Sequence, residues 1–158
     1  MGNPQQRTYV PPDRVAPLLP SAAEQRAQRL ATGFVVICCG GHNYQDRARV
    51  FAALDKAHFK RPITLPVHGA CMDLKTHALA GADRWADEWA RENGVNPELH
   101  PASWEMWGKA AGPMRNKQMA EAGAHVCIAF PGGTGTANMI RNARARGIVV
   151  WEPYPSKA

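Results

Sequence analysis

Short apolar segments alternate with amphipathic ones along most of this chain, and the alternation constrains the fold more than any other feature. The run Phe34–Cys39 is continuously apolar and rich in β-branched residues, which is typical of a strand buried on both faces. The segment after it carries apolar residues at helical spacing: Val50, Phe51, Leu54 and Ala57. Strands that alternate with helices predict an α/β fold in which helices cover both faces of a mostly parallel sheet.

The same pattern continues to the end of the chain. We predict strands over residues 34–39, 63–67, 97–100, 126–130 and 148–151, and helices over residues 21–31, 46–58, 82–90, 112–122 and 136–146. Ser21 and Glu24 have capping-box spacing at the start of the first helix. In the helix over 82–90, alanines and tryptophans form one face, so Asp83 and Asp87 are expected on the opposite, solvent-facing side.

The length of 158 residues fits one compact domain, which we place at residues 21–158. Residues 1–20 hold five prolines and little periodicity, which predicts an extended or disordered arm. No apolar run approaches the roughly 20 residues of a membrane helix, and the polar start of the chain lacks a signal core. We therefore expect a cytoplasmic protein without a membrane partner.

The formal charge of +6 leaves nucleic acid, a phosphorylated small molecule and plain solubility open as explanations. The four cysteines, Cys38, Cys39, Cys71 and Cys127, include no Cys-x-x-Cys pair, so zinc-site spacing is missing. We expect them to be reduced thiols, buried in strands and a loop. Neither a metal nor a cofactor is predicted.

Glycines cluster directly after the predicted strands, where parallel sheets bind ligands. The richest cluster, Pro131–Thr136, lies between a strand and a helix. Its glycines permit close backbone approach, and free amides at the helix start favour a phosphate or carboxylate. The cluster matches neither the P-loop nor Gly-x-Gly-x-x-Gly, and a tight turn without a ligand is the alternative.

Arg115, near the start of the helix before this strand, suits recognition of phosphate or carboxylate, although any single Arg is more often a solvated surface residue. Asp46 fits a helix N-cap as well as a ligand contact, and His42 fits an ordinary polar loop residue. The candidate ligand-binding residues are Gly40, Gly41, His42, Tyr44, Asp46, Gly69, Asp83, Arg115, Asn116, Pro131, Gly132, Gly133, Thr134, Gly135 and Thr136.

Four motifs in order carry a resemblance to a known family. They are Gly40-Gly41-x-x-Tyr44-x-Asp46, Gly81-Ala82-Asp83 with Trp89-Ala90, Trp104 with Gly108-Lys109-Ala110-Ala111-Gly112-Pro113-x-Arg115-Asn116-x-x-Met119, and Phe130-Pro131-Gly132-Gly133-x-Gly135-Thr136. Over residues 34–151 the chain resembles the YspA-type, YpsA-related branch of the SLOG superfamily. The resemblance implies a Rossmann-like three-layer α/β/α sandwich and a homo-oligomer. SLOG relatives include LOG phosphoribohydrolases, DprA/Smf DNA-binding proteins and proposed sensors of nucleotide-derived ligands.

The LOG motif, Pro-Gly-Gly-x-Gly-Thr-x-x-Glu, is only partly retained, because Met139 occupies its acidic position. A thioether neither accepts a proton nor stabilises a ribosyl cation as a carboxylate does. Asp46 and Asp83 are both candidates to replace it. We therefore favour a protein that binds a nucleotide or nucleotide-derived small molecule. The alternatives are a LOG-like nucleoside 5′-monophosphate phosphoribohydrolase and a single-stranded nucleic-acid-binding protein of DprA type.

Overall fold

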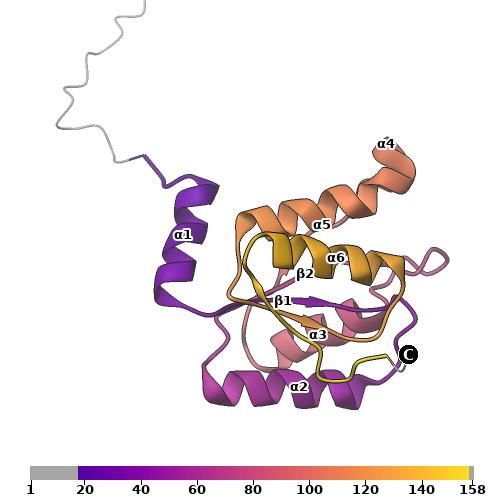
Figure 1. Ribbon diagram of the computed structural model, residues 1–158, viewed down its shortest axis with the longest axis horizontal. Coiled ribbons are helices and arrows are strands. Elements are labelled where there is room, and N and C mark those ends of the chain that lie inside the picture. Colours follow the sequence, from indigo (N-terminus) through magenta and orange to yellow (C-terminus); the bar gives the residue numbers. More distant parts are fainter. Residues whose placement is uncertain (1–17, 157–158) are drawn as a thin grey trace, which may run out of the picture.

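The computed structural model describes residues 18–156, which form one α/β domain around a five-stranded parallel sheet (Figure 1). The strand order is β3-β2-β1-β4-β5, and every neighbouring pair is parallel. The strands are β1 (Val35–Cys39), β2 (Leu65–His68), β3 (Glu98–Leu99), β4 (Val126–Ala129) and β5 (Val149–Trp151). The fold class expected from the alternating pattern is confirmed.

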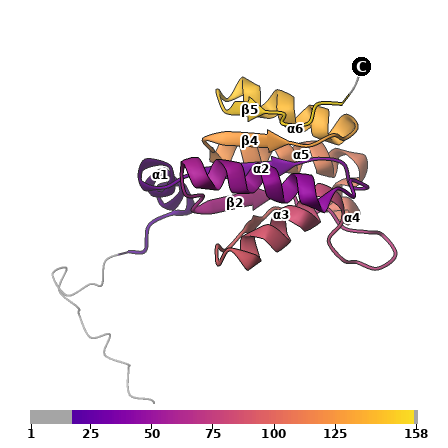
Figure 2. The same cartoon turned by 90° about the horizontal axis from the view of Figure 1, so that it is seen from below.

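Helices cover both faces of the sheet. Packed on one face are α2 (Arg47–Lys60) and α3 (Gly81–Glu92), and on the other are α5 (Ala111–Ala122) and α6 (Thr134–Ala145), as Figures 1 and 2 show. The first helix, α1 (Ala22–Thr32), lies at one end of the sheet, and the predicted capping box between Ser21 and Glu24 is present. Most of the predicted N-terminal arm, residues 1–17, lies outside the described residues; residues 18–20 form neither helix nor strand.

The sheet is buried between two apolar layers. All five residues of β1 are buried, as its continuous apolar run predicts. Towards α2 and α3 the largest fully buried side chain is Trp89, whose indole N–H donates to Asp55 Oδ1 at 2.8 Å. Towards α5 and α6 the layer includes Met119 and Met139. These layers hold the strands rigidly, so the loops at their carboxyl ends start from fixed positions.

Three of the local differences from the sequence-based expectation concern α5, α6 and the segment before them. A short helix, α4 (Trp104–Trp107), and a 3₁₀ turn, Gly108–Ala110, precede α5, where no element was predicted. Trp104 and Trp107 are about half exposed, and Trp104 packs against Gly112 at the start of α5. The third feature is α6, which begins at Thr134 instead of Thr136 because Thr134 and Gly135 already form its first turn.

The cysteines are free thiols, as expected. Cys38, Cys39 and Cys127 are buried in β1 and β4, and Cys71 is half-buried in the loop after β2. Burial raises the pKa of the Cys38 thiol, which keeps it protonated at neutral pH.

Candidate functional site

The candidate site lies at the carboxyl edge of the sheet, where the chain order reverses. From β1 the chain moves outward through β2 to β3, and it then returns to the other side of β1 for β4 and β5. The reversal point is therefore between β1 and β4. Open parallel sheets bind ligands at this kind of point, because the loops that follow the two strands diverge there. The loops after β1 and β4 are the two richest in predicted site residues.

Gly41 joins these two loops directly. Its N–H donates to Pro131 O at 2.9 Å, and its carbonyl accepts from the N–H of Ala82 at the start of α3 at 3.2 Å. The predicted residues Gly41, Pro131 and Gly132 are thus brought together, although 90 residues separate the two loops in sequence.

Glycine is required at two of these contacts. A Cβ on Gly132 would collide with Thr136 Oγ1 and lie 2.7 Å from Gly41 N. Gly81 has a φ of +62°, and a Cβ there would collide with Gly41 O and lie 2.6 Å from His42 Cα. The glycines after β1, before α3 and after β4 therefore allow three backbone segments to approach closely.

The first turn of α6 is open. Gly133 is the N-cap and makes no side-chain capping bond, and a Cβ on Gly133 or Gly135 would meet nothing within 4 Å. The N–H groups of the first turn have no acceptor within the helix. Thr134 is exposed, whereas Thr136 is buried beneath Gly132. The turn offers free amide donors and the positive end of a helix dipole to an anion.

A small hollow of about 150 Å³ adjoins this turn. Gly132, Gly133 and Thr136 line one side of it, and the segment after β5 lines the other with Glu152 and Tyr154. Glu152 carries a negative charge beside the hollow and pairs with Arg144 of α6 at 3.6 Å. Pockets for drug-sized ligands measure roughly 300–1,000 Å³. The hollow therefore has room for one part of a nucleotide, such as a phosphate group.

Asn116 fixes the first turn of α6 from the side. This buried side chain on α5 donates from Nδ2 to Gly135 O at 3.2 Å and to Asn138 Oδ1 at 3.1 Å. Because the amide binds the backbone of the turn itself, Asn116 positions the amides that the sequence analysis assigned to an anion.

Arg115 connects two further loops. Its guanidinium donates to Gly69 O, to His100 O at 3.2 Å and, through Nε, to Asn116 Oδ1 at 2.9 Å. A Cβ on Gly69 would collide with this guanidinium, so a larger residue there would displace the Arg115 side chain from its present position. The structure thus gives Arg115 a positioning role in the loops after β2 and β3, in addition to its charge.

The expectation that Asp83 and Asp87 face solvent is wrong: both are buried on α3. Asp83 accepts from the N–H of Cys71 at 3.0 Å. Burial raises the pKa of Asp83, opposed by the electrostatic effect of the nearby His68 ring, by the Cys71 N–H and by Arg115. Asp83 is therefore a desolvated carboxyl group near the same edge of the sheet as the glycine loops.

Asp87 belongs to a buried polar pair with His68. His68 Nδ1 accepts from the N–H of Ala70 at 3.0 Å, so Nε2 carries the proton and donates to Asp87 Oδ1 at 2.8 Å. Burial raises the pKa of Asp87, but the hydrogen bonds from Arg91 and His68 outweigh it and hold that pKa below its ordinary value. These partners satisfy the carboxylate that periodicity alone had assigned to solvent.

The remaining candidates lie in the loop after β1. Asp46 is the N-cap of α2 and accepts from the N–H of Arg49 at 3.0 Å, which identifies its structural role. His42 is exposed. The Tyr44 hydroxyl is buried without a hydrogen-bond partner in the part of the chain that the structure describes, and its ring lies 5.8 Å from that of Phe130. Gly40 packs against Ala82 and Phe130.

Sequence reasoning missed the segment after β5. Tyr154 stacks on Phe130 with ring centroids 6.5 Å apart, and the Arg49 guanidinium lies 4.9 Å from the Tyr154 ring centroid. An aromatic residue between Pro153 and Pro155, just after the last strand, was the available signal.

Within residues 18–156 no three His, Cys, Asp or Glu side chains gather as metal ligands do, and no helix is long and apolar enough to span a bilayer.

Part of this chain matches a known protein family. The family described as "YspA, cpYpsA-related SLOG family" matches residues 34–107, which include the loop after β1, Gly69 and Asp83. The match ends before Arg115 and the Pro131–Thr136 loop. Gene 61 protein of Mycobacterium phage D29 is 42% identical over 123 residues, covering 73% of this chain and 92% of the phage protein.

The chain belongs to the YspA, cpYpsA-related SLOG family, and this membership suggests a nucleotide-related function. Among solved structures, a universal stress protein from Archaeoglobus fulgidus resembles the chain with a TM-score of 0.46 and 19% sequence identity. That similarity covers 76% of this chain and 93% of the archaeal one.

Proposed function

We propose that this protein binds a nucleotide or nucleotide-derived small molecule at the carboxyl edge of the sheet. Its phosphate lies on the first turn of α6, Arg115 supplies a nearby positive charge, and the loop 40–46 lies beside the ribose or base. The observation that carries the proposal is the uncapped first turn of α6 next to the chain reversal between β1 and β4. Family membership supports the same class of ligand.

The turn is shaped for an anion by its neighbours as well as by its glycines. Asn116 binds the turn's backbone through Gly135 O, and Gly41 holds the preceding loop through Pro131 O. The amide donors are therefore held in place before a ligand arrives, which lowers the entropy cost of binding.

Calorimetric titration with AMP, ADP-ribose, NAD and cyclic dinucleotides tests the proposal. The informative variant is Gly133→Asp, because an aspartate at this N-cap places its own carboxylate on the amides that the phosphate requires. We expect ligand binding to be lost while the free energy of unfolding stays the same or rises by a few tenths of a kcal/mol.

Gly94→Asp is the matched control. Gly94 follows α3, has a φ of +67° that aspartate tolerates, and has open space around it. The substitution changes net charge by the same amount, far from the glycine loops. Binding to none of the ligands, or equal affinity in Gly133→Asp and the wild type, overturns the proposal.

A second candidate activity is N-glycosidic hydrolysis of a nucleoside 5′-monophosphate. Met139, which holds the position of the acidic residue of the LOG motif, is buried in the core between α6 and the sheet. The observation that favours the activity is Asp83, whose raised pKa suits an acid. Chromatographic detection of free base, released by the wild type and not by Asp83→Asn, would establish it.

The single-stranded nucleic-acid alternative gains no support from Arg144 and Arg146 at the end of α6. Arg144 and Arg146 are exposed but pair with Glu152 and Glu121, at 3.6 and 2.9 Å. A titration with single-stranded DNA at two salt concentrations distinguishes this alternative, because phosphate-driven binding weakens steeply as salt rises.

A further inference from the structure

A second hollow, of about 420 Å³, lies on the face of the sheet that carries α2 and α3, beyond α2 over β4 and β5. Its apolar surface consists of Phe34, Ala57, Val126, Ile128, Val149 and Trp151. The two helices of this face leave the β5 side of the sheet uncovered, and Val149 is 64% exposed. The hollow lies away from the glycine loops, since Phe34 and Val126 stand at the amino ends of their strands.

Three cations border the hollow: Lys56 and Lys60 of α2 and Arg61 at its C-terminus. No carboxylate of the residues that the structure describes lines it. Within residues 18–156 neither lysine forms an ion pair, and Lys56 Nζ lies 5.8 Å from the centroid of the Trp151 ring. Arg61 donates to Gly33 O, and its guanidinium lies over the Phe34 ring at 4.7 Å.

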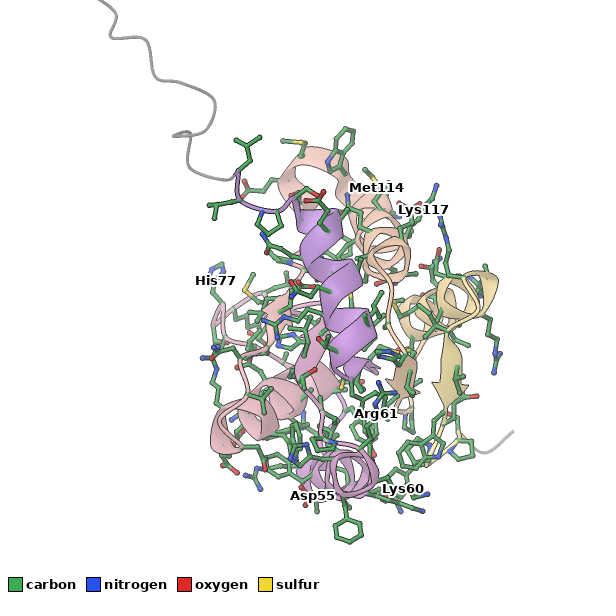
Figure 3. All side chains as sticks on the ribbon, turned by 90° about the vertical axis from the view of Figure 1, so that its left-hand side faces the viewer. Asp55, Lys60, Arg61, His77, Met114 and Lys117 are labelled. Carbon is green, nitrogen blue, oxygen red and sulfur yellow. The ribbon has the colours of Figure 1, made fainter. Side chains whose placement is uncertain are left out.

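Asp55, the acidic residue of α2, points away from the rim of the hollow that these three cations form. In Figure 3, Asp55 and Lys60 lie on opposite sides of α2, which is seen end-on, and Lys60 and Arg61 lie towards β4 and β5. Asp55 accepts a hydrogen bond from Trp89 of α3. The hollow therefore combines an apolar floor with uncompensated positive charge.

We propose that this hollow is a binding site for a small amphiphilic anion, meaning an aromatic or acyl body that carries one carboxylate, sulfonate or phosphate group. The volume lies within the range of small-molecule pockets. Trp151 and the valines bury the apolar body, while the two lysines pair with the anionic group from the rim. Among the side chains of the floor only Trp151 carries a polar group, its indole N–H, and none offers an acceptor for reading the edge of a base, so this ligand class differs from that of the glycine loops.

The rim also argues against a second copy of this chain as the occupant. Face-to-face pairing across a two-fold axis would bring two sets of three cations together, and like charges at short distance oppose association. An anionic ligand instead removes the local repulsion among Lys56, Lys60 and Arg61.

Two fluorescent probes test the site on the full chain. Anilinonaphthalene sulfonate is an amphiphilic anion, and N-phenylnaphthylamine is its uncharged counterpart without the sulfonate. We expect the sulfonate to bind with one-to-one stoichiometry and at least fivefold more tightly than the neutral probe. The amide signals of Val126, Val149 and Trp151 should shift in two-dimensional NMR spectra.

Substitutions test whether binding depends on the lysines at the rim of the hollow or only on the net charge of the protein. The double variant Lys56→Gln/Lys60→Gln should bind the sulfonate on the order of fivefold more weakly, because the sulfonate loses both of its lysine partners on the rim. The control Lys75→Gln/Lys109→Gln removes two exposed lysines elsewhere and should bind like the wild type. Val149→Asp, at an exposed position, should weaken binding further. Gly133→Asp should leave probe binding unchanged, which keeps this site distinct from the proposed nucleotide site.

Three results would overturn the assignment. One is equal affinity for the charged and neutral probes. Another is unchanged affinity in Lys56→Gln/Lys60→Gln. The third is sedimentation showing a dimer that dissociates on Val149→Asp substitution, because a second copy would then occupy the hollow.

Discussion

Because the glycine loops are in tight contact, we predict that one added methyl group has opposite effects on stability at Gly132 and at Gly135. In Gly132→Ala the new Cβ would collide with Thr136 Oγ1 and lie 2.7 Å from Gly41 N. Backbone atoms form part of that wall, so a rotamer change alone does not relieve the overlap. Overpacking of this kind costs about 1–3 kcal/mol.

In Gly135→Ala the same methyl group meets nothing within 4 Å, and the residue already lies in the first turn of α6. Alanine favours a helix over glycine by about 0.5–1 kcal/mol. Both substitutions restrict the unfolded chain equally, so that contribution cancels between the two variants. The difference in unfolding free energy between them is therefore about 1.5–4 kcal/mol, from the sum of the packing and helix effects.

Urea unfolding followed by far-ultraviolet circular dichroism measures this difference directly. Thermal unfolding provides a second measurement. For a domain of this size we expect the melting temperature of Gly132→Ala to fall by roughly 3–9 °C and that of Gly135→Ala to stay level or rise. The close approach of the loops after β1 and β4 is refuted if the unfolding free energies of the two variants differ by less than about 0.5 kcal/mol, because substitutions without a packing defect usually lie within that range.

Three further predictions follow from single side chains. The hydrogen bond from His100, opposed by burial and helped by Arg26, lowers the pKa of Glu98 from 4.5 to about 2. The stability that ionised Glu98 contributes is thus present above pH 4.5 and is lost as the pH falls towards 2. In Glu98→Gln the urea concentration at the unfolding midpoint should therefore fall less between pH 4.5 and pH 2 than it does in the wild type. An equal fall in both proteins contradicts the assignment. Tyr44→Phe removes a buried hydroxyl without a partner and should leave the unfolding free energy equal or up to about 1 kcal/mol higher, whereas a clear loss would reveal a missed partner. Asn116→Leu removes the acceptor of Arg115 Nε and the amide that donates to Gly135 O, and should cost about 1–3 kcal/mol by the same denaturation assay; a smaller change would mean that water replaces the amide.

Much of the fold was predictable because the spacing of apolar residues along the sequence indicates where strands and helices form. The apolar run of β1 identified a buried central strand, and the Ser21–Glu24 spacing identified the start of α1. The glycines after β1 and β4 were recognisable because such residues follow strands where backbones approach closely. Their mutual contact through Gly41 N and Pro131 O needed the sheet order, which places β4 beside β1.

Periodicity failed where a polar side chain had a distant partner. Asp83 and Asp87 occupy the polar side of α3 in sequence, yet their partners Cys71 and His68 lie 12 and 19 residues away. A helical wheel cannot distinguish a carboxylate that faces water from one that faces a buried donor. The position of Tyr154 beside Phe130 depends in the same way on how the chain leaves β5.

The sequence by itself therefore determined the alternation of strands and helices, the parallel sheet and the type of residue at each loop, because these follow from short-range pattern and backbone preference. Only the tertiary structure decided which loops meet, which carboxylates are desolvated and which part of the sheet stays uncovered. These depend on strand order and on how many helices cover each face, and thus on contacts between residues far apart in the chain.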